Sequence, residues 1–238
     1  MRAILFDFGG TMDFPRHWLD RFLSHYREAG FSLSRSELDL AFDAATRTAY
    51  HSTAQVRHYQ LAELLDYLIG LQLVFLRDHR MLTGANPDLQ NPSILSRALK
   101  QIGEAFVAES RRGMSVSREV LANLKDRFTL GVVSNFYGNL DVIMSEAGFD
   151  GIVAGIADSG VVGIYKPDLG IYKAALSAIG AEPLGTVMVG DSLDKDCAPA
   201  QALGMRTVWL RHREAEDPPS SLAANFTIRD LNELKALL

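Results

Sequence analysis

The sequence predicts an α/β fold in which a parallel sheet carries an inserted, all-helical region. Three observations support this prediction. Residues 2–8 form a short apolar run, typical of a buried strand, that reaches Asp7 near its end, and after residue 115 strand-like and helix-like segments alternate. Strands that alternate with helices form parallel sheets covered on both faces. Between these parts, residues 15–112 show the three- and four-residue spacing of apolar side chains that indicates helices.

The inserted region contains its own helix signals. Ser34 followed by Glu37 predicts a capping box at the start of a helix, and residues 83–92, rich in Gly, Asn and Pro, predict a loop. The longest apolar stretch, residues 64–76, is shorter than the roughly 20 residues of a membrane span. We expect a buried helix there, with an apolar contact to a second subunit as the alternative.

The second part of the chain predicts the rest of the sheet. We expect strands at residues 129–133, 151–154, 186–189, 206–210 and 226–228, and helices at 116–127, 140–147, 170–179, 197–203 and 231–237. The expected organisation is a Rossmann-like core of residues 1–14 and 113–238 with a helical cap of residues 15–112. Ligands of such sheets bind beyond the carboxyl ends of the strands, so an insert directly after the first strand would lie over the site.

Composition excludes several classes of partner. A formal net charge of −5 argues against a nucleic-acid or anionic-membrane surface, either of which would need a basic stripe. The single cysteine, Cys197, excludes an intrachain disulfide and fits a reducing compartment. The amino-terminal apolar run is too short for a signal peptide, so we expect a cytoplasmic protein. The choice between monomer and homodimer stays open.

Polar residues follow four of the predicted strands or loops, in the segments Asp7–Asp13, Ser134–Asn135, Lys166–Asp168 and Gly190–Asp196. Each has a simpler interpretation when taken alone, as a turn, a helix cap, a solvated lysine or an acidic loop. The carboxyl ends of parallel strands meet at one edge, however, so these side chains should converge there. Carboxylates gathered at one edge repel one another unless a cation lies among them, and oxygen ligands favour Mg²⁺.

Together and in this order, the four segments resemble those of the haloacid dehalogenase (HAD) superfamily. The resemblance covers the whole predicted core, and the position of the insert matches the helical cap of that family. It implies a Mg²⁺-dependent hydrolase that removes phosphate from a small phosphorylated metabolite. Asp7 would be the nucleophile that forms an aspartyl-phosphate, and Lys166 would keep Asp7 ionised and offset charge on the phosphoryl group.

The resemblance also assigns the other site residues. Ser134 and Lys166 would hold the phosphoryl oxygens, with Asn135 and Thr11 as further candidates. The expected metal ligands are Asp7, Asp191, Asp196 and the backbone carbonyl of Gly9.

Gly9 departs from the family pattern. The phosphatases of the family carry at this position an Asp that protonates the leaving group and then deprotonates the attacking water. Such acid/base catalysis contributes about 10²- to 10⁴-fold, roughly 3 to 5 kcal/mol. Asp13 is the first candidate to replace it and His17 the second, among the cap histidines His17, His25, His51, His58 and His79.

The departure leaves a second hypothesis open, in which the chain is a catalytically weak protein that senses or holds phosphate and metal. Haloacid dehalogenases of the superfamily also lack this acid. They use no metal, however, and lack the carboxylate cluster that Asp191 begins.

Overall fold

The computed structural model describes residues 2–13, 16–84, 88–212 and 223–238. The chain divides into two compact units. Met1–Arg16 and Arg111–Leu238 form one, here called the sheet unit, and His17–Ser110 form the other, the helical unit. The boundary expected between residues 14 and 15 lies outside the described residues.

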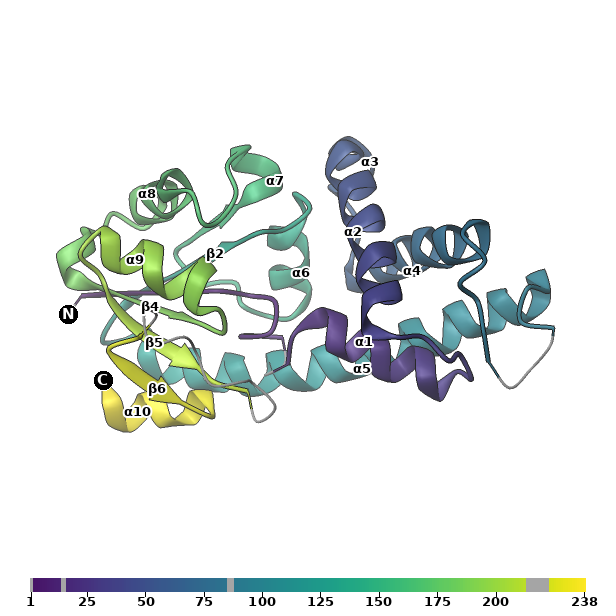
Figure 1. Ribbon diagram of the computed structural model, residues 1–238. Coiled ribbons are helices and arrows are strands. Elements are labelled where there is room, and N and C mark those ends of the chain that lie inside the picture. Colours follow the sequence, from purple (N-terminus) through teal and green to yellow (C-terminus); the bar gives the residue numbers. More distant parts are fainter. Residues whose placement is uncertain (1, 14–15, 85–87, 213–222) are drawn as a thin grey trace. The chain divides into compact units, whose positions relative to one another are not determined.

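The sheet unit is built on six parallel strands in the order β3-β2-β1-β4-β5-β6 (Figure 1). The strands are β1 (Ala3–Phe6), β2 (Thr129–Ser134), β3 (Gly155–Asp158), β4 (Thr186–Gly190), β5 (Arg206–Leu210) and β6 (Phe226–Ile228). Every residue of β1 and β4 is buried, because helices cover both faces of a parallel sheet. The predicted α/β fold is confirmed.

Short helices connect and cover the strands. They are α6 (Leu140–Glu146), α7 (Ser159–Val162), α8 (Leu169–Ala178), α9 (Ala198–Ala202) and α10 (Leu234–Leu237), with 3₁₀ turns at Pro183–Gly185 and Leu231–Glu233 and a π turn at Leu193–Cys197. In Figure 1, α8 lies on one side of the sheet, and α10 lies on the other with the last part of α5 (Pro92–Leu124).

Two expectations about these elements are wrong. The residues expected to form a helix from 116 are helical up to Leu124, but the helix does not begin there, because α5 runs without a break from Pro92 to Leu124. Within it the Ser117 hydroxyl donates to the carbonyl of Gly113, a bond that a helix tolerates. The expected strand at residues 151–154 is a turn, in which Gly151 adopts a positive φ of 71°. The strand begins only at Gly155, where pairing with β2 starts.

The helical unit contains α1 (Trp18–Glu28), α2 (Arg35–His51), α3 (Thr53–Val56), α4 (Leu61–Asp78) and the first part of α5. The capping box of Ser34 and Glu37 is present at the start of α2. The apolar face of α4 is buried within the unit, so the expected buried helix is confirmed; its buried apolar residues are Leu61, Leu64, Leu65, Leu68, Ile69, Leu73 and Leu76. Of the helices in the described residues, none is long and apolar enough to cross a membrane.

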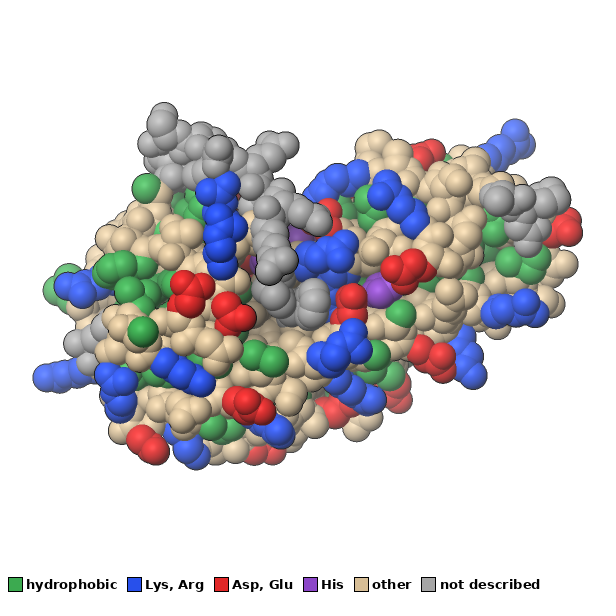
Figure 2. All heavy atoms as spheres, turned by 90° about the horizontal axis from the view of Figure 1, so that it is seen from below, with side chains coloured by type: hydrophobic (Ala, Val, Ile, Leu, Met, Phe, Trp, Pro, Cys, Tyr) green, Lys and Arg blue, Asp and Glu red, His purple; other side chains and the backbone are tan. Residues whose placement is uncertain are grey.

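Charged side chains of both signs are exposed on one face of the molecule (Figure 2). On the face that Figure 2 shows, Lys and Arg side chains are interspersed with Asp and Glu. This mixture agrees with the small net charge of −5. The absence of nucleic-acid and membrane partners stays a prediction.

Candidate active site

Asp7 lies at the centre of the polar cluster at the carboxyl edge of the sheet. It follows β1 directly, and its backbone N–H donates to the carbonyl of Val189 at 2.9 Å. Its side chain is buried, and two donors hold Oδ1: the Lys166 ammonium at 2.5 Å and the Ser134 hydroxyl at 3.1 Å. The Thr11 hydroxyl donates to Oδ2 at 3.3 Å. Three separate segments therefore fix the orientation of this carboxylate.

Lys166 links two carboxylates of the cluster. Its Nζ donates to Oδ1 of Asp7 and, at 2.7 Å, to Oδ1 of Asp196. Burial alone would lower the pKa of Lys166, but the negative charges of Asp196 and Asp7 outweigh it and raise the pKa. The ammonium therefore stays charged inside the protein.

Asn135 holds the backbone of Lys166 rather than an oxygen of the cluster. Its Oδ1 accepts from the Lys166 N–H at 2.7 Å, and its Nδ2 donates to the Lys166 carbonyl at 3.1 Å. Both ends of the amide are therefore engaged. This geometry favours a role for Asn135 in fixing the loop of Lys166. Direct binding of phosphate by Asn135 stays a prediction.

Three carboxylates form a candidate cation site. Asp7, Asp191 and Asp196 each offer an oxygen, and these three oxygens lie within 4.8 Å of one another. Burial raises the pKa of Asp196 to about 7, with Asp7 and Asp191 adding to the effect and Lys166 opposing it. Burial likewise raises the pKa of Asp7. One ammonium among three carboxylates leaves negative charge uncompensated, so an all-oxygen site here fits a hard divalent cation.

Two glycines allow these carboxylates to come close to the backbone. Gly10 has a φ of 83°, and a Cβ there would lie 2.5 Å from Oδ2 of Asp191. A Cβ on Gly190 would overlap the carboxylate of Asp196. Larger residues at either position would push a candidate ligand out of the cluster.

Strand β5 and the residues after it support Asp191. The indole N–H of Trp209 donates to the Asp191 carbonyl at 2.8 Å, and Nε2 of His212 lies 3.0 Å from Oδ2 of Asp191. Neither residue was among the candidates from the sequence. The one available signal was that His212 follows a predicted strand at the same edge of the sheet.

Gly9 lies in a tight turn directly after Phe8. The amides of Thr11, Met12 and Asp13 all donate to the Phe8 carbonyl. Asp13 is fully buried, and its Oδ1 accepts from the N–H of Gly10 at 2.8 Å. This contact gives Asp13 a structural task in the turn, and its replacement of the missing acid stays a prediction.

The five histidines expected as possible substitutes all belong to the helical unit. Nδ1 of His17 caps α1 by accepting from the Leu19 N–H at 3.2 Å. His25 is buried between Glu28 and Glu109, and His79 is paired with the carbonyl of Phe75. His51 and His58 are exposed. Three of the five therefore already have local structural contacts.

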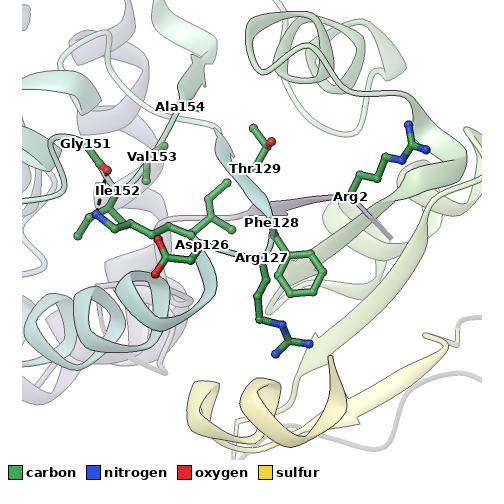
Figure 3. A pocket seen from close by; sticks show the side chains of 11 residues that line it. Arg2, Asp126, Arg127, Phe128, Thr129, Gly151, Ile152, Val153 and Ala154 are labelled. Carbon is green, nitrogen blue, oxygen red and sulfur yellow. Dashed lines mark hydrogen bonds between the residues drawn. The ribbon is translucent and has the colours of Figure 1, made fainter.

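A cavity of about 670 Å³ lies at the opposite, amino-terminal edge of the sheet. Arg2, Lys125 and Arg127 contribute cationic side chains to its lining. Figure 3 shows that the guanidinium groups of Arg2 and Arg127 point away from each other, and Lys125 is engaged with the carbonyl of Gly151. The cations do not converge on one point, so this cavity has no built anion site.

Comparisons with known proteins show which family this chain resembles. A family model described as haloacid dehalogenase-like hydrolase matches residues 1–204. The phosphoserine phosphatase of Thermus thermophilus is 33% identical over 140 residues, which cover 57% of this chain and 55% of that protein, about half its length. Haloacid dehalogenase-like hydrolase domain-containing protein 3 of Danio rerio is 26% identical over 100% of this chain and 96% of its own. A dehalogenase crystal structure shares the fold, with a TM-score of 0.65, 16% identity and coverage of 100% and 97%.

Proposed function

Because the chain belongs to the haloacid dehalogenase-like hydrolase family, we propose that it is a Mg²⁺-dependent phosphatase acting on a small phosphorylated metabolite. The observation that carries the proposal is the cluster around Asp7. A buried carboxylate with one ammonium, two hydroxyls and two further carboxylates around it suits the transfer of a phosphoryl group. The helical unit would serve as the cap.

The chemistry begins with Asp7. One carboxylate oxygen forms a bond to phosphorus while the bond from phosphorus to the leaving oxygen breaks, and the leaving group keeps the electron pair. Lys166 favours the ionised nucleophile and offsets the negative charge on the phosphoryl oxygens. Ser134 and Thr11 keep the carboxylate in one orientation through their hydroxyl groups. Water then attacks phosphorus, which releases phosphate and regenerates Asp7.

The oxygens of Asp7, Asp191 and Asp196, with the carbonyl of Gly9, would hold Mg²⁺. When bound, the cation supplies positive charge that stabilises the transferring phosphoryl group. The carboxylate cluster also distinguishes this proposal from a metal-free dehalogenase, which has no need of buried acids in this number.

Gly9 limits the kinds of leaving group that the site can release quickly. With no acidic side chain at position 9, a leaving group that needs protonation should be released slowly. Acyl phosphates, phosphoanhydrides and aryl phosphates have leaving groups that need little protonation. We therefore propose that these substrates are turned over faster than alkyl phosphates. The same glycine favours a second candidate function, a sensor that binds phosphate and metal but turns over little.

A substrate panel tests the proposal. The protein is incubated with acetyl phosphate, p-nitrophenyl phosphate and sugar phosphates, with Mg²⁺ or with EDTA. Turnover that requires Mg²⁺ and is lost in Asp7→Asn supports the phosphatase. Asp194→Asn is the matched control, because Asp194 is exposed and bonded to Ser192 outside the cluster. Absence of turnover together with Mg²⁺-dependent phosphate binding would favour the sensor and contradict the phosphatase.

A further inference from the structure

We infer that His212 is a positioning residue for the metal centre, which orients the carboxylate of Asp191 toward the bound cation. The inference rests on the proposed function, since it assigns a role within that site. His212 follows β5 at the carboxyl edge of the sheet, two residues beyond Leu210. Its Nε2 lies 3.0 Å from Oδ2 of Asp191, and both side chains are largely buried, with 15% and 10% of their surface exposed.

The direction of the hydrogen bond follows from the partners. An ionised carboxylate can only accept, so Nε2 carries the proton and donates it to Asp191. Nδ1 of His212 is buried and has no hydrogen-bond partner among the described residues. The polar contact of this ring is therefore directed at Asp191, and a side chain placed merely to pack would not need it.

Each of the other two carboxylates in the cluster is held in the same manner. Lys166 and Ser134 donate to Oδ1 of Asp7. Asp196 accepts from Lys166 on Oδ1 and from the N–H of Ser192, at 3.0 Å, on Oδ2. Lys166 donates to Asp7 and Asp196 but not to Asp191 in these bonds. His212 is the side chain that donates a hydrogen bond to the Asp191 carboxylate.

The backbone adds to this arrangement. Trp209 holds the carbonyl of Asp191, and Gly10 leaves room beside Oδ2. With Oδ2 bonded to His212, Oδ1 of Asp191 would be the oxygen available to a cation. Partners that orient metal ligands in this way typically contribute 10- to 100-fold to metal affinity. We therefore expect His212→Leu to weaken Mg²⁺ binding by about 10- to 100-fold.

Calorimetric titration with Mg²⁺ and separately with Mn²⁺ tests the inference without measuring turnover. The variants are His212→Leu, which removes the donor, and His212→Gln, which keeps an N–H near the position of Nε2. His58→Leu is the matched control, because that histidine is exposed in the helical unit. Circular dichroism of each metal-free variant confirms that it is folded.

The expected result is a loss of affinity in His212→Leu by a similar factor for both metals, with recovery in His212→Gln and no change in His58→Leu. Unchanged affinity in His212→Leu would overturn the inference. A loss confined to Mn²⁺, which binds imidazole more readily than Mg²⁺ does, would also overturn it, because His212 would then be a ligand itself. If the unaltered protein binds neither metal, the metal site and the proposed function fail together.

Discussion

Replacement of Lys166 by Met should destabilise the metal-free sheet unit strongly. Met has a similar length but no charge, so the change removes the ammonium and leaves Asp7, Asp191 and Asp196 facing one another. Nζ of Lys166 lies 2.5 Å from Asp7 and 2.7 Å from Asp196, and all three side chains are at least 94% buried. Removing one partner of a buried ion pair costs about 3–5 kcal/mol, because the remaining charge is left without compensation.

The cost should depend on pH. The pKa of Asp196 is raised to about 7, so near pH 6 this carboxyl takes up a proton and relieves part of the repulsion. At pH 8 the unaltered protein gains the ion pair between Lys166 and ionised Asp196, which the variant lacks, so we expect the upper end of the range, about 5 kcal/mol. For a chain of this size each kcal/mol shifts the melting temperature by roughly 2–4 °C, which gives a shift of about 10–20 °C at pH 8.

Fluorescence of Trp209 follows this unfolding. The chain has two tryptophans, and Trp18 lies in the helical unit, so a Trp18→Phe background leaves Trp209 as the reporter of the sheet unit. Urea titrations without metal compare Lys166→Met with Lys173→Met, an exposed lysine of α8, which should change stability by less than about 0.5 kcal/mol. Equal stabilities for the two variants at pH 8 would refute the reasoning.

Three further predictions concern the same site. The pKa of Asp196 rises from 3.8 in the unfolded chain to about 7 in the metal-free fold, so between these pH values only the folded protein holds a proton at Asp196. The free energy of unfolding should therefore fall as pH rises through this range. Mg²⁺ binds the ionised form of Asp196, so the increase in melting temperature that Mg²⁺ produces should grow with pH. An increase that is the same at every pH would contradict this prediction. Asn135→Ala should lower stability by about 1–3 kcal/mol in urea titrations, for two lost hydrogen bonds, whereas exposed Asn123→Ala should not. Gly9→Asp should raise steady-state turnover by about 10²- to 10⁴-fold, most for sugar phosphates; no gain would mean that another group already transfers the proton.

The sequence allowed the sheet and the cluster to be predicted, because both depend on local patterns. Apolar runs and helix signals marked the strands and helices, and polar residues at the strand ends marked the edge where Asp7, Ser134 and Asp191 meet. Parallel pairing then brings them together whatever the details of the connections. Periodicity could not show that the helical pattern before residue 113 and the helix expected from residue 116 are one helix, α5, because the spacing of apolar residues does not reveal a break or its absence.

Contacts that depend on how neighbouring strands and loops are aligned in the fold could not be predicted from sequence motifs. Gly190 pairs with Trp209, and this pairing places the residues after β5 beside Asp191. A shift in register would move His212 away from that carboxylate without changing any sequence motif. Asn135 is a similar case, because an amide after a strand can meet a ligand or a neighbouring loop, and only the fold decides that it meets Lys166.

The absence of an acid/base side chain at Gly9 affects the two steps of the proposed reaction differently. The first half forms the aspartyl-phosphate, and the second half hydrolyses it. In the first half, a good leaving group departs without an acid, so Lys166 and the cation site suffice to form the aspartyl-phosphate. In the second half the attacking water finds no base at position 9, whatever the substrate was. Phospho-enzyme should therefore accumulate, and rapid mixing with p-nitrophenyl phosphate should release about one equivalent of nitrophenol per site before a slow steady state. Gly9→Asp should shrink this burst by accelerating the second half. A linear time course in the unaltered protein, at the same substrate concentration, would show that the base is supplied by another group or that the first half is the slow one.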